Sequence, residues 1–145
     1  MSDKHKFLMI PTHLVEILFD KIEPHLQRVV DASNGEITCE SVKAKALRGD
    51  CGFILVSDGP NVVAVNTIEV CQYDSGLRVL LIPVVGGTEA FDWGPDFLTF
   101  CRELAKDLGC TEMRGFSSRQ AWLKVLRDYG WDESHFVIKC DVSDL

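Results

Sequence analysis

Apolar side chains recur at helical spacing in the first third of the chain. The first such pattern covers residues 12–30, and Pro24 within it predicts a kink or a division into two short helices, because proline lacks the N–H that a helix needs. Thr38 is a typical helix-capping residue, and the pattern after it predicts a second helix that stops at Gly49. The chain is therefore expected to begin with two helices.

Short apolar runs follow and predict strands. Residues 51–57 and 62–70 flank a turn-forming segment over 57–61, so they are expected to form a hairpin. Residues 77–85 read LRVLLIPVV, the most apolar run in the chain, which is typical of a central strand buried on both faces. Three consecutive strands are therefore expected to pair in order.

The second half of the chain alternates helix and strand. Residues 86–95 are expected to form a loop, and Pro95 fits the first turn of a helix that ends at Gly109. The remaining elements are a strand over 110–116, a helix from Ser117 or Ser118 to about Asp128, and a strand over 136–142.

Together these elements predict the fold class. The order ααβββαβαβ indicates a single α/β (α+β) domain over residues 1–145, with a mixed central sheet of about six strands and helices on both faces. The strand–helix–strand step near the end predicts a parallel pair.

Composition excludes several classes of protein. The chain has 145 residues, of which 46% are hydrophobic, so one folded domain is expected. Fifteen basic and 22 acidic residues give a net charge of −7, which disfavours general nucleic-acid binding. No apolar run approaches the roughly 18 residues of a membrane span, and no signal peptide is recognised. A cytoplasmic protein is expected.

The residue types that bind metals are dispersed. Six cysteines occur without a C-x-x-C pair, and the four histidines are far apart in the sequence. We expect reduced thiols, most of them buried, and no metal site.

The order of elements resembles that of the GNAT acyltransferase superfamily, in which a long apolar strand leads into a glycine loop, here Gly86-Gly87, and then a helix. Residues 119–131, RQAWLKVLRDYGW, look like the penultimate helix of that superfamily, ending in Gly130-Trp131. More narrowly, the chain is similar to short GNAT-like proteins of tailed phages and prophages. The features shared with that group include Asn34-Gly35, Thr38, Leu47, Gly49-Asp50, Trp93, Ala105, Gly109-Cys110 and Trp122.

This resemblance implies acetyl-CoA as a cofactor. The pantetheine arm would lie along the strand that precedes Gly86, and the pyrophosphate would bind the loop before the helix at Pro95. The implied cofactor residues are Leu81, Ile82, Val84, Gly86, Gly87, Trp93 and Gly94. The implied general base is Glu69. The implied acid is Tyr129, three residues beyond the superfamily's tyrosine position at Leu126 and so close to one helical turn away.

The cofactor loop departs from the superfamily pattern. No lysine or arginine lies between Arg78 and Arg102, while Glu89 and Asp92 would repel a pyrophosphate. Two functions therefore stay open. One is an acetyl-CoA-dependent N-acetyltransferase that acts on a small amine or a protein amine. The other is a catalytically inactive GNAT-like protein of a phage virion, of phage assembly or of host interaction, with a phage or host protein as its partner.

Overall fold

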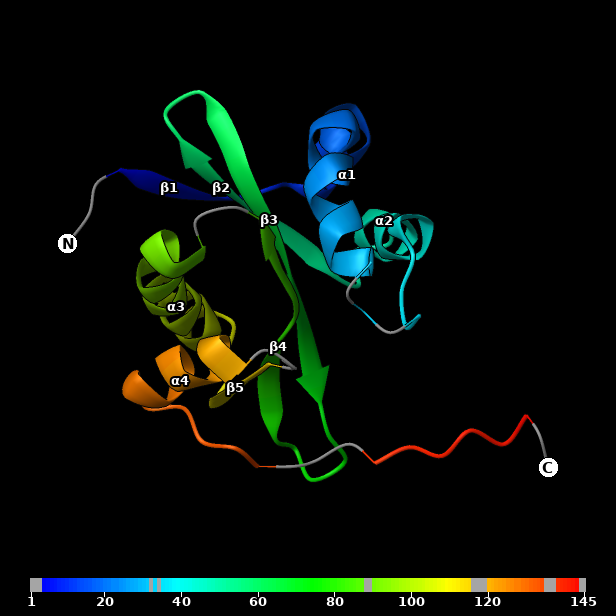
Figure 1. The fold of residues 1–145 in the computed structure, drawn as a ribbon, viewed down its shortest axis with the longest axis vertical. Helices are drawn as coiled ribbons and strands as arrows, with labels where there is room; N and C mark the ends of the chain where they lie inside the picture. Colours follow the sequence, from blue (N-terminus) through cyan, green and yellow to red (C-terminus); the bar gives the residue numbers. More distant parts are fainter. Residues whose placement is uncertain are drawn as a thin grey trace.

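The computed structural model describes residues 4–31, 33, 35–87, 90–115, 120–134 and 138–143, and its centre is one five-stranded sheet (Figure 1). Neighbouring strands follow the order of the chain. They are antiparallel except for the last pair, which is parallel, as the sequence predicts. The strands are β1 (His5–Met9), β2 (Gly52–Asp58), β3 (Asn61–Gln72), β4 (Arg78–Gly87) and β5 (Glu112–Gly115).

Helices cover both faces of this sheet. In Figure 1, α1 and α2 lie on one side, and α3 and α4 on the other, which confirms the predicted α+β architecture. The helices are the short 3-10 helix η1 (Thr12–Leu14), α1 (Val15–Asp31), α2 (Cys39–Leu47), α3 (Ala90–Asp107) and α4 (Gln120–Asp128). In the described part of the chain, no helix is long and apolar enough to cross a membrane.

Alternation along β3 divides the core into two halves. Val65 packs with Phe19 of α1 in one apolar cluster, while Ala64 and Ile68 pack with Trp93 of α3 in the other. Successive strand residues point to opposite faces, so Glu69, which follows Ile68 and lies four residues after Val65, faces α1 and α2.

Two features of the first half of the chain differ from the sequence-based expectation. Helix α1 is continuous over its 17 residues, so Pro24 does not divide it into two helices, and the alternative of a kink at Pro24 stays a prediction. Pro24 lies on the exposed side of this helix, where water can satisfy the carbonyl that loses its partner. The sequence analysis also did not predict β1. This edge strand has only five residues, with Lys6 near its start and Lys4 just before it, and shows no clear alternation of apolar and polar residues.

Two expectations for the second half also need correction. Helix α3 begins at Ala90, so Pro95 lies inside it. Of the predicted loop over 86–95, residues 86–87 belong to β4 and residues 90–95 to α3, while residues 88–89 lie outside the described part. Trp93 and Phe97, one turn apart, both bury their rings against the sheet, and this packing extends the helix past the proline. Residues 138–143 form no strand, and Ile138 is 92% exposed, while residues 136 and 137 lie outside the described part.

Candidate active site

A bulge in β4 lies at the centre of the candidate site. Thr67 pairs with Val84 and Glu69 pairs with Leu81, so Ile82 and Pro83 of β4 together oppose one residue of β3. A proline fits here, because the bulged residue donates no hydrogen bond to the ladder. A bulge also increases the local twist, which turns the rest of β4 away from its former course.

The described pairing between β4 and β5 extends as far as this bulge. Its last pair is Ile82 with Gly115, whereas β4 continues to Gly87. Among the described residues, the part of β4 beyond Ile82 pairs only with β3. Backbone groups on such a free strand edge can bind an extended ligand that carries amide groups. A cleft between the two strands beyond this point, closed at Ile82 and Gly115 and open toward Gly87, is therefore what the family resemblance predicts; residues 116–119, which would complete its other wall, lie outside the described part of the chain.

The residues predicted to bind a cofactor divide between two elements. Five of them, Leu81, Ile82, Val84, Gly86 and Gly87, lie on β4. Ile82 is buried in the core and Leu81 is half-buried. The other two, Trp93 and Gly94, lie in the first turns of α3 and are buried. The Trp93 ring packs edge-on against Phe97 with 5.6 Å between ring centres. A ring without exposed surface holds α3 on the sheet, so its assignment to the cofactor site stays a prediction that this burial does not favour.

The start of α3 carries negative rather than positive charge. Asp92 is exposed in its first turn, where a carboxylate is stabilised by the helix dipole. The sequence places no basic residue near it, and Glu89 lies outside the described residues. Arg78 is held at the opposite end of β4, where its Nε donates to the Leu108 carbonyl at 2.9 Å. This end of the cleft suits a pyrophosphate poorly.

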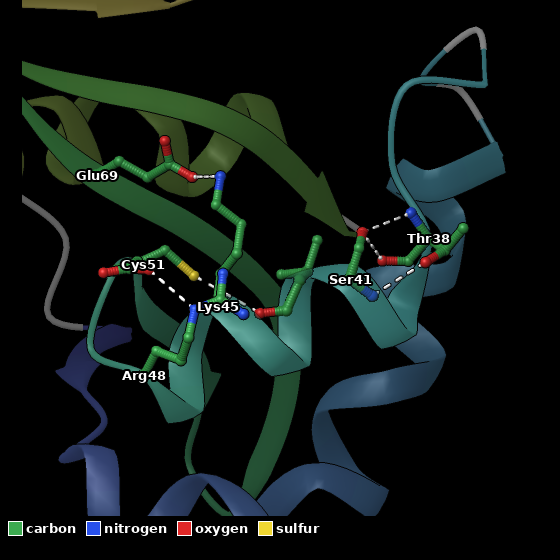
Figure 2. Close-up of polar contacts among 8 residues, drawn as sticks. Thr38, Ser41, Lys45, Arg48, Cys51 and Glu69 are labelled. Atoms are coloured by element: carbon green, nitrogen blue, oxygen red, sulfur yellow. Dashed lines mark hydrogen bonds and ion pairs between the residues drawn. The ribbon is translucent and has the colours of Figure 1, made fainter.

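The candidate base Glu69 lies directly across the strand pair from Leu81, at the closed end of the cleft. Its carboxylate accepts a hydrogen bond from the Nζ of Lys45, which extends from α2 (Figure 2). The Glu69 side chain is 23% exposed and that of Lys45 is 42% exposed. The predicted base therefore contacts an amine, that of Lys45, and the sequence analysis did not predict this contact.

Local sequence fixes the helix that presents Lys45. The Thr38 hydroxyl accepts from the Ser41 N–H at 2.9 Å, and the Ser41 hydroxyl accepts from the Thr38 N–H at 3.0 Å, which completes a capping box (Figure 2). Val42 and Ala46 are buried on the sheet side. At the far end, the Asp50 N–H donates to the Lys45 carbonyl at 2.9 Å. Helix α2 is therefore held at both ends.

A cavity of about 380 Å³ lies beside Glu69, around the start of β2. Its polar groups include two carboxylates, Glu69 and Asp50, with the hydroxyl of Thr12 and the thiol of Cys51. Its lining residues are Met9, Ile10, Thr12, Val15, Ala46, Gly49, Asp50, Cys51, Gly52, Phe53, Ile68, Glu69, Val70 and Leu108. Both carboxylates have an internal basic partner, Lys45 for Glu69 and Arg48 for Asp50. A cationic ligand that displaced either partner would be favoured here over an anionic one.

The predicted acid Tyr129 is separated from Glu69 by the sheet. It follows α4, which packs through Leu126 against Leu98 of α3 on the other face. Its side chain is 55% exposed, in the turn that Gly130 completes with a φ of +88°. The next residue, Trp131, approaches Gly115 at the closed end of the cleft, where an added Cβ would lie 3.9 Å from its ring. Trp131, rather than Tyr129, therefore lies beside the closed end of the cleft.

The cysteines differ in burial, and all six are free thiols. Burial raises the pKa of Cys51 to about 11 and that of Cys101 to about 12. A thiol with such a pKa carries little of the reactive thiolate at neutral pH. Cys51 is therefore a poor nucleophile, although it lines the cavity, and its Sγ donates weakly to the Val42 carbonyl at 3.7 Å.

Thiol labelling measures this difference directly. At pH 8, we expect a disulfide reagent such as Ellman's reagent to modify exposed Cys140 within seconds to minutes. Cys51 should react at least 100-fold more slowly, and Cys101 only when the protein unfolds, because burial keeps both protonated. Peptide mapping of timed samples identifies each thiol, and urea-unfolded protein is the control. Rapid modification of Cys51 in the folded protein would contradict this assignment.

Comparison with protein-family models gave no match, and comparison with curated protein sequences gave none either. The sequence alone thus identifies no relative by these two routes.

Solved structures do match over nearly the whole chain. An aminoglycoside acetyltransferase from an uncultured soil metagenomic sample, in complex with sisomicin, has a TM-score of 0.71 at 14% identity, with 97% of each chain covered. A protein described as a predicted acetyltransferase from Clostridium acetobutylicum, with acetyl-CoA, has a TM-score of 0.68 at 11% identity, with 97% of this chain and 98% of that chain covered.

A third structure is similar. The ribosomal-protein-alanine N-acetyltransferase of Brucella melitensis has a TM-score of 0.68 at 10% identity and covers 94% of this chain and 99% of its own. Structural matches at such low sequence identity establish the architecture and leave the activity open. The mixed sheet, its helix placement and these matches show that the chain has the fold of the GNAT acetyltransferases.

Proposed function

We propose that this chain is an acetyl-CoA-dependent N-acetyltransferase that acts on a primary amine. The observation that carries the proposal is the position of Glu69, directly across from Leu81 at the closed end of the β4–β5 cleft. An extended arm that enters the cleft from Gly87 brings its reactive end to this point. The free edge of β4 fits the amide-bearing pantetheine arm of acetyl-CoA, whereas Asp92 does not fit its pyrophosphate.

Glu69 supplies the chemistry that an amine requires. An ammonium group cannot attack a thioester until it loses a proton, and a carboxylate within hydrogen-bond reach can accept that proton. The contact with Lys45 shows that the Glu69 carboxylate can receive an ammonium group in this place. Help for the leaving group matters less, because a thiol with a pKa near 8.5 already leaves readily as a thiolate. Tyr129 is therefore proposed only as a weak contributor.

The acidic cavity is proposed as the site of the acceptor. Glu69 and Asp50 line it, and a cationic amine placed there would have its nitrogen beside the base. Three of the similar structures are of aminoglycoside acetyltransferases, one of them in complex with sisomicin, so sisomicin and the polyamine spermidine are suitable probes.

Isothermal titration with acetyl-CoA tests the proposal, with CoA as the control ligand. We expect dissociation constants in the micromolar range for both, because most of the contact surface is shared. Release of CoA in the presence of spermidine or sisomicin, measured by chromatography, would then confirm transfer. Absence of binding heat at millimolar acetyl-CoA would exclude the proposed acetyltransferase function.

That negative result would favour the second candidate, a GNAT-fold binding protein without catalysis. The exposed carboxylate of Asp92 at the start of α3 and the lack of basic residues between Arg78 and Arg102 favour it. Its assignment to a phage rests on the sequence resemblance, and the structural matches do not add to it. Capture of a protein partner from infected cells would then be the next experiment.

A further inference from the structure

Lys45 places an amine against Glu69, the carboxylate proposed above as the general base. Its Nζ donates to the Glu69 carboxylate from the α1–α2 side of the sheet, 24 positions away in the sequence (Figure 2). The carboxylate proposed to deprotonate an external amine is therefore already in contact with an internal one. This pair is partly shielded from solvent, since Glu69 is 23% exposed.

The neighbouring lysine on α2 has different partners. Lys43 pairs with Glu16 of α1 at 3.0 Å, and its ammonium lies 4.8 Å from the centre of the Phe19 ring. Lys43 and Lys45 therefore point to different partners, although both are paired with a glutamate. Only Lys45 approaches β3 opposite Leu81.

Lys45 also lies near the closed end of the cleft. The described pairing between β4 and β5 extends to Ile82, the residue after Leu81, and Leu81 is the cross-strand neighbour of Glu69. An acyl group bound along β4, as proposed above for acetyl-CoA, would reach this point. A lysine side chain has enough length and rotational freedom to follow its carboxylate partner toward that group.

We propose that Lys45 is an intramolecular acceptor, so that the protein acetylates itself at this residue; the proposal rests on the acetyltransferase function proposed above. Glu69 takes a proton from the Lys45 ammonium, and the freed nitrogen attacks the thioester carbonyl carbon of acetyl-CoA. A C–N bond forms and the C–S bond breaks. The nitrogen loses two protons in total: one ends on the CoA sulfur, and the other is released to water through Glu69.

The modification changes the site. An acetylated lysine carries no positive charge, so its ion pair with Glu69 is lost. Glu69 is then open to an external amine in the adjoining cavity. Self-acetylation of Lys45 would therefore precede, and promote, transfer to other amines.

The test uses the full chain with isotopically labelled acetyl-CoA at pH 7.5. Intact-mass measurement should show one acetyl group per chain, and peptide mapping should place it on Lys45 rather than Lys43. The rate per molecule should not change when the protein is diluted tenfold, because the reaction is intramolecular. Glu69→Gln should lower the labelling rate at least 100-fold. Lys43→Arg is the matched control and should leave the rate unchanged.

Several outcomes would overturn the proposal. Equal labelling of Lys43 and Lys45, or labelling of Lys45 that Glu69→Gln does not slow, would mean ordinary chemical acetylation of surface lysines. Protein that binds acetyl-CoA and acetylates spermidine while Lys45 stays unmodified would refute self-acetylation and leave the enzyme proposal intact. Failure to bind acetyl-CoA at all would refute both. Thermal melting of each variant checks that it is folded.

Discussion

Glu69→Gln should lower kcat for acetylation of spermidine or sisomicin by a factor of about 10² to 10⁴ at pH 7.5. The amide has the shape of the carboxylate and can still accept a hydrogen bond from Lys45, but it cannot take a proton. Binding of acetyl-CoA should be unchanged, because Glu69 faces α2 and not the free edge of β4. Chromatographic measurement of CoA release gives kcat, and isothermal titration gives the dissociation constant.

The pH dependence of this variant separates proton removal from simple loss of structure. A primary amine has a pKa near 10.4, so its free-base fraction rises about tenfold per pH unit below that value. The rate of Glu69→Gln should therefore rise with pH, and its deficit relative to the native protein should shrink. A deficit that stays constant from pH 7 to pH 9.5 would contradict a role as general base.

Asp50→Asn provides the matched control. Asp50 lines the same cavity, but its carboxylate pairs with Arg48 at 3.0 Å and lies on the helix–strand turn rather than opposite Leu81. Loss of its charge should raise KM for a cationic acceptor several-fold and leave kcat close to native. An equal fall of kcat in both variants would mean that the two carboxylates support the cavity rather than the chemistry.

Local rules predicted the elements whose signals lie within a few residues. Thr38 begins α2 and Gly49 follows its end, as expected, because capping and termination depend on adjacent residues. The parallel pairing of β4 with β5 also follows from a rule of connection that needs only the order of elements. The strand predicted over 136–142 is absent from its described residues, 138–142. A pattern of apolar residues indicates which side of a strand would be buried, but not whether a partner strand is present.

Tertiary contacts decided what the sequence could not show. A proline in the first turn usually marks a helix start, yet burial of Trp93 extends α3 upstream of Pro95. The pair of Lys45 and Glu69 joins a helix to a strand, and nothing in their spacing distinguishes it from two exposed charges. The cavity beside them has lining residues from six elements, so it exists only in the folded chain.

Trp93→Ala should reduce the free energy of unfolding by about 3–5 kcal/mol, since it removes a fully buried ring and leaves a cavity. The ring packs against Phe97, whose own ring lies 5.9 Å from that of Phe7 on β1, so the loss affects the contact of α3 with the sheet. Urea denaturation at unchanged m-value measures the effect. Tyr129→Ala, at a side chain that is 55% exposed, should change stability by less than about 0.5 kcal/mol.

A second variant, Trp93→Phe, decides whether Trp93 belongs to the cofactor site. If the ring only holds α3 in place, Trp93→Phe should restore most of the stability, and acetyl-CoA should bind it with nearly native affinity, because an aromatic ring again fills the space against Phe97. If the indole contacts the cofactor, affinity should fall at least tenfold in Trp93→Phe even where stability is retained. Its complete burial argues for the first result, in which the cofactor is bound by the backbone of β4 and the start of α3 contributes through its position.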